Sequence, residues 1–180
     1  MKEDILQEIK NELINGYAKR KHPFRYFTLA TINNTIPRLR TAVLRKMQPD
    51  FTIIVYTDLR SQKVADIQEN NMVSGLFYHP KKLLQIKIEG TAEIISDKNA
   101  LKPYWSSVGE NSKKDYTTEK APATIIKNPE FVSYSAKTNY FCVLKISISK
   151  IEYLRLKRPN HIRVNFIKTE TGFKGDFLVP

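Results

Sequence analysis

Residues 24–57 read FRYFTLATINNTIPRLRTAVLRKMQPDFTIIVYT and indicate the fold class most clearly. Aromatic and β-branched residues dominate 25–32, and the Asn-Asn pair that follows is a typical hairpin turn. Residues 36–47 read as the return strand, and residues 51–57 read as a third strand after a Pro-Asp turn. The pattern therefore predicts an antiparallel meander of three strands.

Further segments with strand character follow these three. Residues 83–95 alternate apolar and polar side chains, which predicts a long strand with two distinct faces. Shorter or less regular strands are expected at 73–78, at 140–156 and within 160–180. Because six or more strands occur without regularly alternating helices, we expect a mainly β protein. The predicted architecture is a closed or nearly closed antiparallel β-barrel with α-helical inserts.

Helical signals are confined to short segments around these strands. An amphipathic helix is expected to stop at Asn15-Gly16, Ser61 is a plausible N-cap for a helix over 61–70, and Asp97 could cap another. The resulting prediction is a single domain over 1–180, made of an N-terminal helix at 1–16, a barrel core at 24–95, a helical and loop insert at 97–138 and closing strands at 139–180.

Composition narrows the class of protein. The chain has 180 residues, 41% of them hydrophobic, and a single cysteine, Cys142, which excludes an intrachain disulfide. Neither a signal-peptide pattern nor an apolar run near the ~18 residues of a membrane span is present, so we expect a cytoplasmic protein without membrane association. The formal net charge of +12 favours an anionic partner: nucleic acid, an anionic membrane surface or a phosphorylated small molecule.

Part of this charge is concentrated between residues 35 and 65. The segment ends with a strand that runs into a helix start near Ser61, a junction whose free backbone N–H groups favour anions. A phosphomonoester needs about two cations with neutral donors, which Thr57, Ser61 and Gln62 could supply. The alternative is a solvated basic hairpin without a ligand. The cations of the segment are Arg38, Arg40, Arg45, Lys46, Arg60 and Lys63, against Asp50 and Asp58.

The order of these segments resembles that of the pyridoxamine 5′-phosphate oxidase family and its FMN-binding split-barrel relatives. The matching pieces are Phe27–Ile32, Pro37–Arg45, Val55–Asp58 with Ser61–Lys63, Val73–Tyr78 and Gln85–Gly90. The resemblance implies an FMN-binding flavoprotein, most simply an oxidoreductase. It also implies a homodimer whose two flavin sites lie at the subunit interface. Relatives of this family bind deazaflavin or haem as well, so the resemblance leaves these cofactors open.

The same resemblance implies roles for individual residues. Arg40 and Lys63 correspond to the phosphate ligands, while Tyr56 and Thr57 correspond to the pair near the ribityl–phosphate end of the flavin. Gln85 corresponds to an amide that reaches the flavin from a neighbouring strand. Arg45 and Gln62 stand where the oxidases usually carry lysine and arginine, respectively. The strand expected to lie along the flavin comprises Arg40, Thr41, Ala42, Val43, Leu44 and Arg45.

Two departures concern the substrate. The oxidases hold pyridoxal phosphate with a Tyr-Phe-x-Ser-Arg-Pro stretch, but here residues 104–109 read YWSSVG and the arginine is Val108. The C-terminal Arg-x-His of the oxidases is replaced by Asn160-His161-Ile162-Arg163, in which the order differs. We therefore expect an FMN protein with an unknown substrate and no identified catalytic residue. A true pyridoxamine or pyridoxine 5′-phosphate oxidase is the alternative.

A second alternative is a basic β-barrel that binds nucleic acid without a cofactor. Aromatic side chains on basic strands can stack on bases, although aromatic residues in strands more often belong to the core. The histidines have no metal-ligand spacing, so no metal site is expected. The aromatic residues in question are Tyr26, Phe27, Phe51, Tyr56, Phe77 and Tyr78, and the histidines are His22, His79 and His161.

Overall fold

The computed structural model describes all 180 residues, and nine antiparallel strands form its single sheet. The strands are β1 (Tyr26–Asn33), β2 (Ile36–Val43), β3 (Lys46–Met47), β4 (Thr52–Asp58), β5 (Met72–His79), β6 (Leu84–Ile95), β7 (Phe141–Arg155), β8 (Ile162–Thr169) and β9 (Gly172–Leu178). The helices are α1 (Lys2–Ala18), α2 (Gln62–Glu69), α3 (Lys98–Ser106) and α4 (Glu110–Lys113), with 3₁₀ turns η1 (Pro23–Arg25), η2 (Pro80–Lys82), η3 (Lys114–Tyr116) and η4 (Pro129–Phe131).

The strands follow the order β2-β1-β5-β6-β7-β4-β3, and β8 and β9 continue from β7. This confirms the prediction of a mainly antiparallel β fold with helical inserts. The sheet does not close, because β2 pairs with β1 alone and β3 pairs with β4 alone. One edge of β2 therefore keeps backbone groups that no strand occupies.

The predicted three-strand meander is wrong at its third member. β1 and β2 form the expected hairpin, but β4 pairs with β3 and β7 and not with β2. The expected return strand over 36–47 breaks at Leu44 and Arg45. The N–H of Leu44 donates to the carbonyl of Arg25, whereas the N–H of Arg45 donates to the carbonyl of Ile54. Between these two hydrogen bonds the chain passes from β2, at one end of the strand order, to β3, at the other end.

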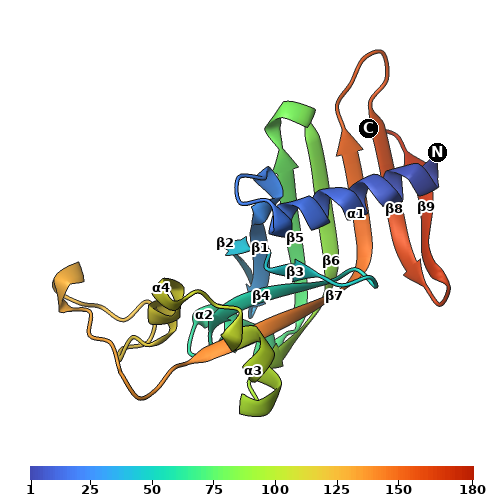
Figure 1. Ribbon diagram of the computed structural model, residues 1–180. Helices are drawn as coiled ribbons and strands as arrows, with labels where there is room; N and C mark the ends of the chain where they lie inside the picture. Colours follow the sequence, from blue (N-terminus) through green and yellow to red (C-terminus); the bar gives the residue numbers. More distant parts are fainter.

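The helix α1 lies across one face of the sheet (Figure 1) and buries Ile5, Ile9 and Leu13 against it. It continues past the predicted stop at Asn15-Gly16 and ends at Ala18. A Cβ at Gly16 would lie 2.9 Å from the carbonyl oxygen of Phe24, so glycine here permits close packing and does not end the helix.

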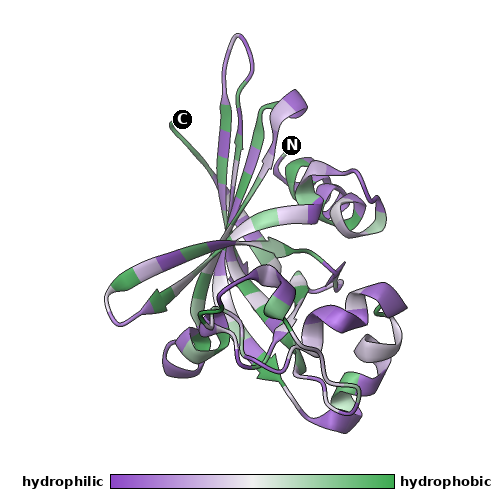
Figure 2. Ribbon diagram, turned by 90° about the vertical axis from the view of Figure 1, so that its left-hand side faces the viewer, coloured by the Kyte–Doolittle hydropathy of each residue, from purple (hydrophilic) through white to green (hydrophobic).

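The main core lies on the inner side of the strands. Apolar and polar residues alternate along them (Figure 2), and Leu84, Ile86 and Ile88 on β6 are buried as the periodicity predicts. A smaller cluster packs on the opposite face of β4 and β7, where Ile54 and Val143 meet residues of the insert. Strands β4 and β7 are thus covered on both faces, which holds the insert against the sheet.

The insert between β6 and β7 begins as predicted. The carboxylate of Asp97 accepts hydrogen bonds from the backbone N–H groups of Asn99 and Ala100 and caps α3. The remainder, with α4 and η4, extends away from the sheet (Figure 1). None of the helices combines the length and apolar character that crossing a membrane requires.

Candidate functional site

Strand β4 divides two groups of functional side chains, because neighbouring residues of a strand point to opposite faces. Thr57 is buried and faces Lys63 of α2. Tyr56 faces Arg45 and the start of the insert, where its hydroxyl lies 3.0 Å from Oγ of Ser107. The predicted residues around β4 therefore form two groups and not one continuous surface.

The first group, which we call the α2 cation site, consists of Arg40, Thr57, Ser61, Lys63 and Asp66. The ammonium of Lys63 donates to Oγ1 of Thr57 at 2.9 Å and to Oγ of Ser61 at 3.3 Å. Lys63 takes part in none of the ion pairs of the chain. Burial lowers its pKa, and the positive charge of Arg40 lowers it further. The site thus contains a half-buried cation held by hydroxyl groups alone.

Residues of β1 and α2 hold the side chain of Arg40 in place. Its guanidinium donates to Oγ1 of Thr31 at 2.6 Å and pairs with the carboxylate of Asp66 at 3.4 Å. Asp66 is fully buried and also accepts hydrogen bonds from Thr31 at 2.7 Å and Asn33 at 3.2 Å. Burial acts to raise the pKa of Asp66, but the hydrogen bonds outweigh it and the pKa is lowered. This carboxylate is ionised and fixes the orientation of Arg40.

Sequence reasoning missed Asp66, although one signal was present. Asp66 follows Gln62 by four residues on α2, so the two share a helix face. The amide of Gln62 donates to Oδ1 of Asp66 at 3.1 Å and is thus engaged within the protein. Arg60, a further candidate from the charge pattern, pairs with Asp58 at 2.7 Å. Arg60 and one N–H of the Gln62 amide are therefore engaged with carboxylates of the protein.

The strand predicted to lie along a flavin has the faces that its sequence implies. Ala42 and Leu44 are buried, and Thr41 is exposed on the outer side. Val43, half-buried, also belongs to this outer side. Because the N–H groups of Leu44 and Arg45 already donate to carbonyls, only the β2 part of this strand offers a free edge.

The second group surrounds a cavity of about 220 Å³ that we call the Arg25 pocket. It lies between the end of α1, the break after β2 and the start of the insert. Arg45, whose Cζ lies 5.3 Å from the ring centroid of Tyr56, lines one wall, and Arg25 lines another. The pocket residues are Tyr17, Arg25, Leu44, Arg45, Tyr56, Ser107, Val108, Gly109 and Ser112.

Gln85 is not near either group within the same chain. It lies on β6, three strands from β2 in the sheet order, or about 14 Å at ~4.8 Å per strand. The pairing registers put it on the outer face with Tyr78 and Lys87. A flavin held at β2 would be out of reach of this amide.

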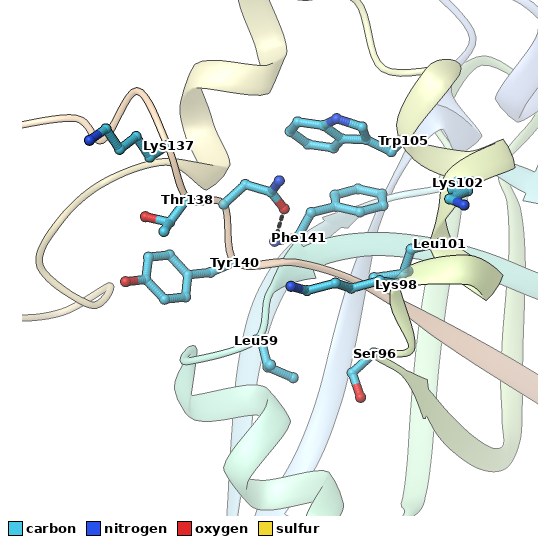
Figure 3. A pocket seen from close by; sticks show the side chains of 11 residues that line it. Leu59, Ser96, Lys98, Leu101, Lys102, Trp105, Lys137, Thr138, Tyr140 and Phe141 are labelled. Carbon is cyan, nitrogen blue, oxygen red and sulfur yellow. Dashed lines mark hydrogen bonds between the residues drawn. The ribbon is translucent and has the colours of Figure 1, made fainter.

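A further cavity of about 430 Å³ contains none of the predicted residues. Figure 3 shows its aromatic side chains, with the Trp105 ring above Phe141, and the lysines Lys98, Lys102 and Lys137 that also line it. All three lysines are exposed. The volume of this cavity does not by itself make it a binding site. It lacks the fixed, half-buried cations that the α2 cation site and the Arg25 pocket contain.

Folding also brings together three residues whose spacing in the sequence does not suggest a site. Glu12, His22 and His79 place possible ligand atoms within 4.8 Å of one another. Both histidines, however, accept backbone N–H groups at Nδ1, and the Lys82 ammonium pairs with Glu12. A neutral ring that accepts at Nδ1 carries its proton on Nε2, so these atoms are poorly prepared to bind a metal. The cluster ties α1 to the end of β5.

Cys142 has the inert environment expected from its apolar neighbours. It is fully buried, and burial raises the pKa of its thiol to about 12. A thiol that stays protonated is a poor nucleophile.

Comparison with known proteins gives consistent matches. The profile of a family described as "Pyridoxamine 5'-phosphate oxidase, FMN-binding domain" matches residues 3–96. A pyridoxine/pyridoxamine 5′-phosphate oxidase 2 of Arabidopsis thaliana is 26% identical over 163 residues, covering 83% of this chain and 82% of the relative. A protein of Caenorhabditis elegans named as a pyridoxamine 5′-phosphate oxidase is 32% identical over 80 residues, 44% of this chain; the aligned part spans only 35% of that relative.

Solved structures extend the likeness of the fold over the whole chain. A pyridoxamine 5′-phosphate oxidase-related, FMN-binding protein of Nostoc punctiforme superposes with a TM-score of 0.80 at 20% identity, covering 97% of both chains. PhzG of Burkholderia lata, solved with tetrahydrophenazine-1-carboxylic acid, gives 0.76 at 15% identity, covering 98% of this chain and 92% of its own.

Proposed function

Because this chain belongs to the pyridoxamine 5′-phosphate oxidase family of FMN-binding domains, we propose that it binds FMN as an oxidoreductase, with the cofactor phosphate at the α2 cation site. One observation supports this proposal above the others: two positively charged side chains lie close together. Lys63 has no acidic partner, and the guanidinium of Arg40 near it is held in place by Asp66. Two cations with the hydroxyls of Thr57 and Ser61 suit a phosphate dianion. Asp66 offsets one positive charge, which makes this cradle weaker than one with a second free arginine.

The remaining contacts follow from the position of β2. Its unpaired edge, from Arg40 to Val43, offers backbone groups to a flat ring. The flavin, when bound, supplies the redox chemistry, and the chain supplies position and charge. Arg45 presents a half-buried cation next to Tyr56, where it would favour an anionic reduced cofactor. The packed cluster behind Tyr56, with Phe141 and Tyr116, would keep water from that side.

We do not assign oxidation of pyridoxine phosphate to this chain. Val108 is buried against Tyr116 and its apolar neighbours, so it cannot bind a phosphate in place of arginine. Arg163 pairs with Glu152 at 3.1 Å, and Nδ1 of His161 accepts the N–H of Lys157. These C-terminal residues are engaged within the protein.

The nucleic-acid alternative receives little support. Phe27, Phe51 and Phe77 are buried in the core and cannot act as stacking platforms. The exposed pair Tyr26 and Tyr78 lies on the outer face of β1 and β5, where other apolar residues accompany it.

A second copy of the chain is the partner we propose for that outer face. The pairing registers of β1, β2 and β5 align Tyr26, Leu39, Leu76 and Tyr78 there, and these side chains are 57%, 69%, 38% and 51% exposed. Large apolar side chains gathered on one exposed face are typical of an interface. Gln85 extends the same face, so a dimer would carry its amide to the flavin of the other subunit, which it cannot reach in its own chain.

The proposal is tested by releasing the bound cofactor from purified protein and identifying it by mass and absorption. We expect FMN, bound in a 1:1 ratio. Protein that remains colourless after incubation with FMN, or that releases haem or a deazaflavin, would contradict it. Mass measurement in solution tests the dimer separately, with Tyr78→Lys as the variant expected to dissociate it.

A further inference from the structure

Two histidines and one glutamate meet where the last turns of α1 approach the end of β5. Glu12 belongs to α1, His22 precedes η1, and His79 is the last residue of β5. The centroids of the two imidazole rings lie 5.5 Å apart, and Nε2 of His22 lies 3.3 Å from the Glu12 carboxylate. Glu12 and His79 are buried, and the His22 side chain is only 11% exposed. These three residues, which we call the histidine cluster, are thus largely shielded from water.

Each histidine of the cluster caps a 3₁₀ turn in its neutral form. Nδ1 of His22 accepts the N–H of Phe24 at 3.2 Å and caps η1, whereas Nδ1 of His79 accepts the N–H of Lys82 at 3.4 Å and caps η2. A nitrogen that accepts a hydrogen bond carries no proton, but an imidazolium carries a proton on both nitrogens. Protonation of either ring therefore sets a donor against a donor and breaks the cap.

The groups that face His22 also oppose a positive charge on its ring. Burial lowers the pKa of His22 most strongly, and His79, Lys82 and Lys19 lower it further, while Glu12 acts in the opposite direction. The effect of Glu12 is limited because its carboxylate already pairs with the Lys82 ammonium. A proton taken up by His22 thus adds a net positive charge to a shielded cluster.

No second carboxylate compensates this charge from the side of β7. Glu8 lies one helical turn before Glu12 on α1, but its carboxylate accepts the hydroxyl of Tyr153 at 2.8 Å and pairs with Arg155 at 3.1 Å. Glu12 is the only acidic side chain among the groups that act on His22. The neutral state of the cluster therefore depends on both rings remaining unprotonated.

The segment held by this cluster supports a distant part of the sheet. The ring of the buried Phe24 lies 5.6 Å from that of His22, and the guanidinium of Arg25 donates to the carbonyl of Tyr17 at the end of α1 at 3.2 Å. The carbonyl of Arg25 in turn accepts the N–H of Leu44 at 2.9 Å, where β2 breaks. Loss of the cap at Phe24 would free the end of α1 and remove one support of this break.

We propose that His22 and His79 form an acid-sensitive latch, which is closed while both rings are neutral and opens on proton uptake to release residues 12–25 from the sheet. Ile5 and Ile9 remain packed, so the change is local. The closed latch disfavours the imidazolium, so its stability is present above the ~6.5 of a free histidine and is lost as the pH falls below that value. One proton taken up on opening raises the opening equilibrium about tenfold between pH 7.5 and 5.5. The proposal does not depend on the flavin site.

Amide hydrogen exchange of the purified protein, resolved by residue with NMR and expressed as protection factors, tests the latch. Between pH 7.5 and 5.5, protection should fall at least about tenfold in the last turns of α1 and at Phe24, whereas protection in β6 and β7 should stay constant. Constant protection of α1 would overturn the proposal. An equal fall in β6 and β7 would also overturn it, because that result indicates global unfolding.

The double variant His22→Asn and His79→Asn should lose this pH dependence. Asparagine is a good N-cap whose side-chain oxygen can accept the same N–H groups, but it takes up no proton in this range. His161→Asn is the matched control, because Nδ1 of the exposed His161 also accepts a backbone N–H, from Lys157 at 3.1 Å, outside the cluster. This control should keep the tenfold fall. If the double variant keeps it as well, the proton acts elsewhere and the latch is wrong.

A measurement on the wild type decides the question even if the double variant fails to fold. Nitrogen-15 chemical shifts distinguish a neutral imidazole with its proton on Nε2 from an imidazolium. Both rings of the cluster should show the neutral Nε2–H form at pH 7.5, and protonation of His22 should coincide with the loss of protection in α1. Protonated rings with α1 still protected, or an Nδ1–H form at pH 7.5, would contradict the proposal.

Discussion

The α2 cation site and the Arg25 pocket each contain two basic side chains, but only the first contains a carboxylate. Asp66 collects donors from β1 and α2 and fixes Arg40, which reduces the net positive charge of that site. In the Arg25 pocket the carbonyl of Tyr17 orients Arg25 and the ring of Tyr56 orients Arg45. No carboxylate neutralises the charge of either arginine. Orientation is thus achieved by a buried ion pair in one site and by neutral contacts in the other.

The difference has a physical consequence for ligands. A buried, fully hydrogen-bonded carboxylate makes a rigid cradle but competes with an incoming anion for the same guanidinium. Arginines without an acidic partner attract an anion more strongly, and this attraction weakens as the salt concentration rises. A ligand that stays bound suits the first arrangement, and one that exchanges readily suits the second.

The largest effect is expected from Asp66→Asn. Thr31, Gln62 and Arg40 all direct donors at this carboxylate, and an amide both removes the charge and adds an N–H group where acceptors are needed. Unfolding free energy should fall by about 3 kcal/mol, measured by urea denaturation. The exposed Glu69→Gln on the same helix is the control and should change it by less than about 0.5 kcal/mol. If the unfolding free energy of Asp66→Asn fell by as little as that of Glu69→Gln, the Asp66 carboxylate would not stabilise the fold.

Lys63→Met should weaken FMN roughly 10- to 100-fold, because a charge-assisted hydrogen bond to the phosphate is lost. Fluorescence titration of FMN measures this. Lys46→Met, an exposed cation on β3, should bind FMN as the wild type does. Equal weakening in both variants would indicate a general effect of charge and not a contact at the α2 cation site.

The two sites should also differ in their response to pH. Burial and the charge of Arg40 lower the pKa of Lys63, while Asp58 acts in the opposite direction with a smaller effect. Only the ammonium form of Lys63 attracts phosphate, so FMN affinity should decline with rising pH before the ~10.4 at which an ordinary lysine loses its proton. Anion binding in the Arg25 pocket should stay constant, since arginine does not titrate in this range. A parallel decline in both sites would contradict the assignment to Lys63.

The smallest effect is expected from Gln62→Arg. An arginine at this exposed position could pair with Asp66 and release part of Arg40 for the ligand, which should strengthen FMN about two- to fivefold. Gln68→Arg adds the same charge about one and two-thirds turns further along α2 and should have less effect. Flavin fluorescence titration of both variants compares them; a greater gain from Gln68→Arg would point to long-range attraction alone.

Several features of this chain were predictable from local patterns. The alternation along β6 correctly indicates its buried face, and Asp97 caps α3 as expected. The family resemblance assigns Arg40 and Lys63 as phosphate ligands, which stays a prediction, and the fold places their side chains close enough for the two charges to interact. Each of these conclusions depends on residues near one another in sequence, or on a spacing that relatives share.

Other features depend on contacts between distant segments. The break at Leu44 requires partners on two different strands, and the Arg25 pocket assembles α1, β2, β4 and the insert. The cluster of Glu12, His22 and His79 joins three segments in the same way. Spacing along the chain carries no signal for such groupings.

The sequence by itself determined that this is a basic, mainly antiparallel β protein with a cation-rich segment before and at the start of α2. Periodicity, turn residues and charge act over a few residues and are therefore visible in the linear order. Tertiary structure decided which cations remain free, because that depends on which carboxylates fold beside them. Asp66 reaches Arg40 from another element, whereas no acid reaches Arg25 or Arg45. The same residue type is thus held by a carboxylate in one place and left without an acidic partner in the other.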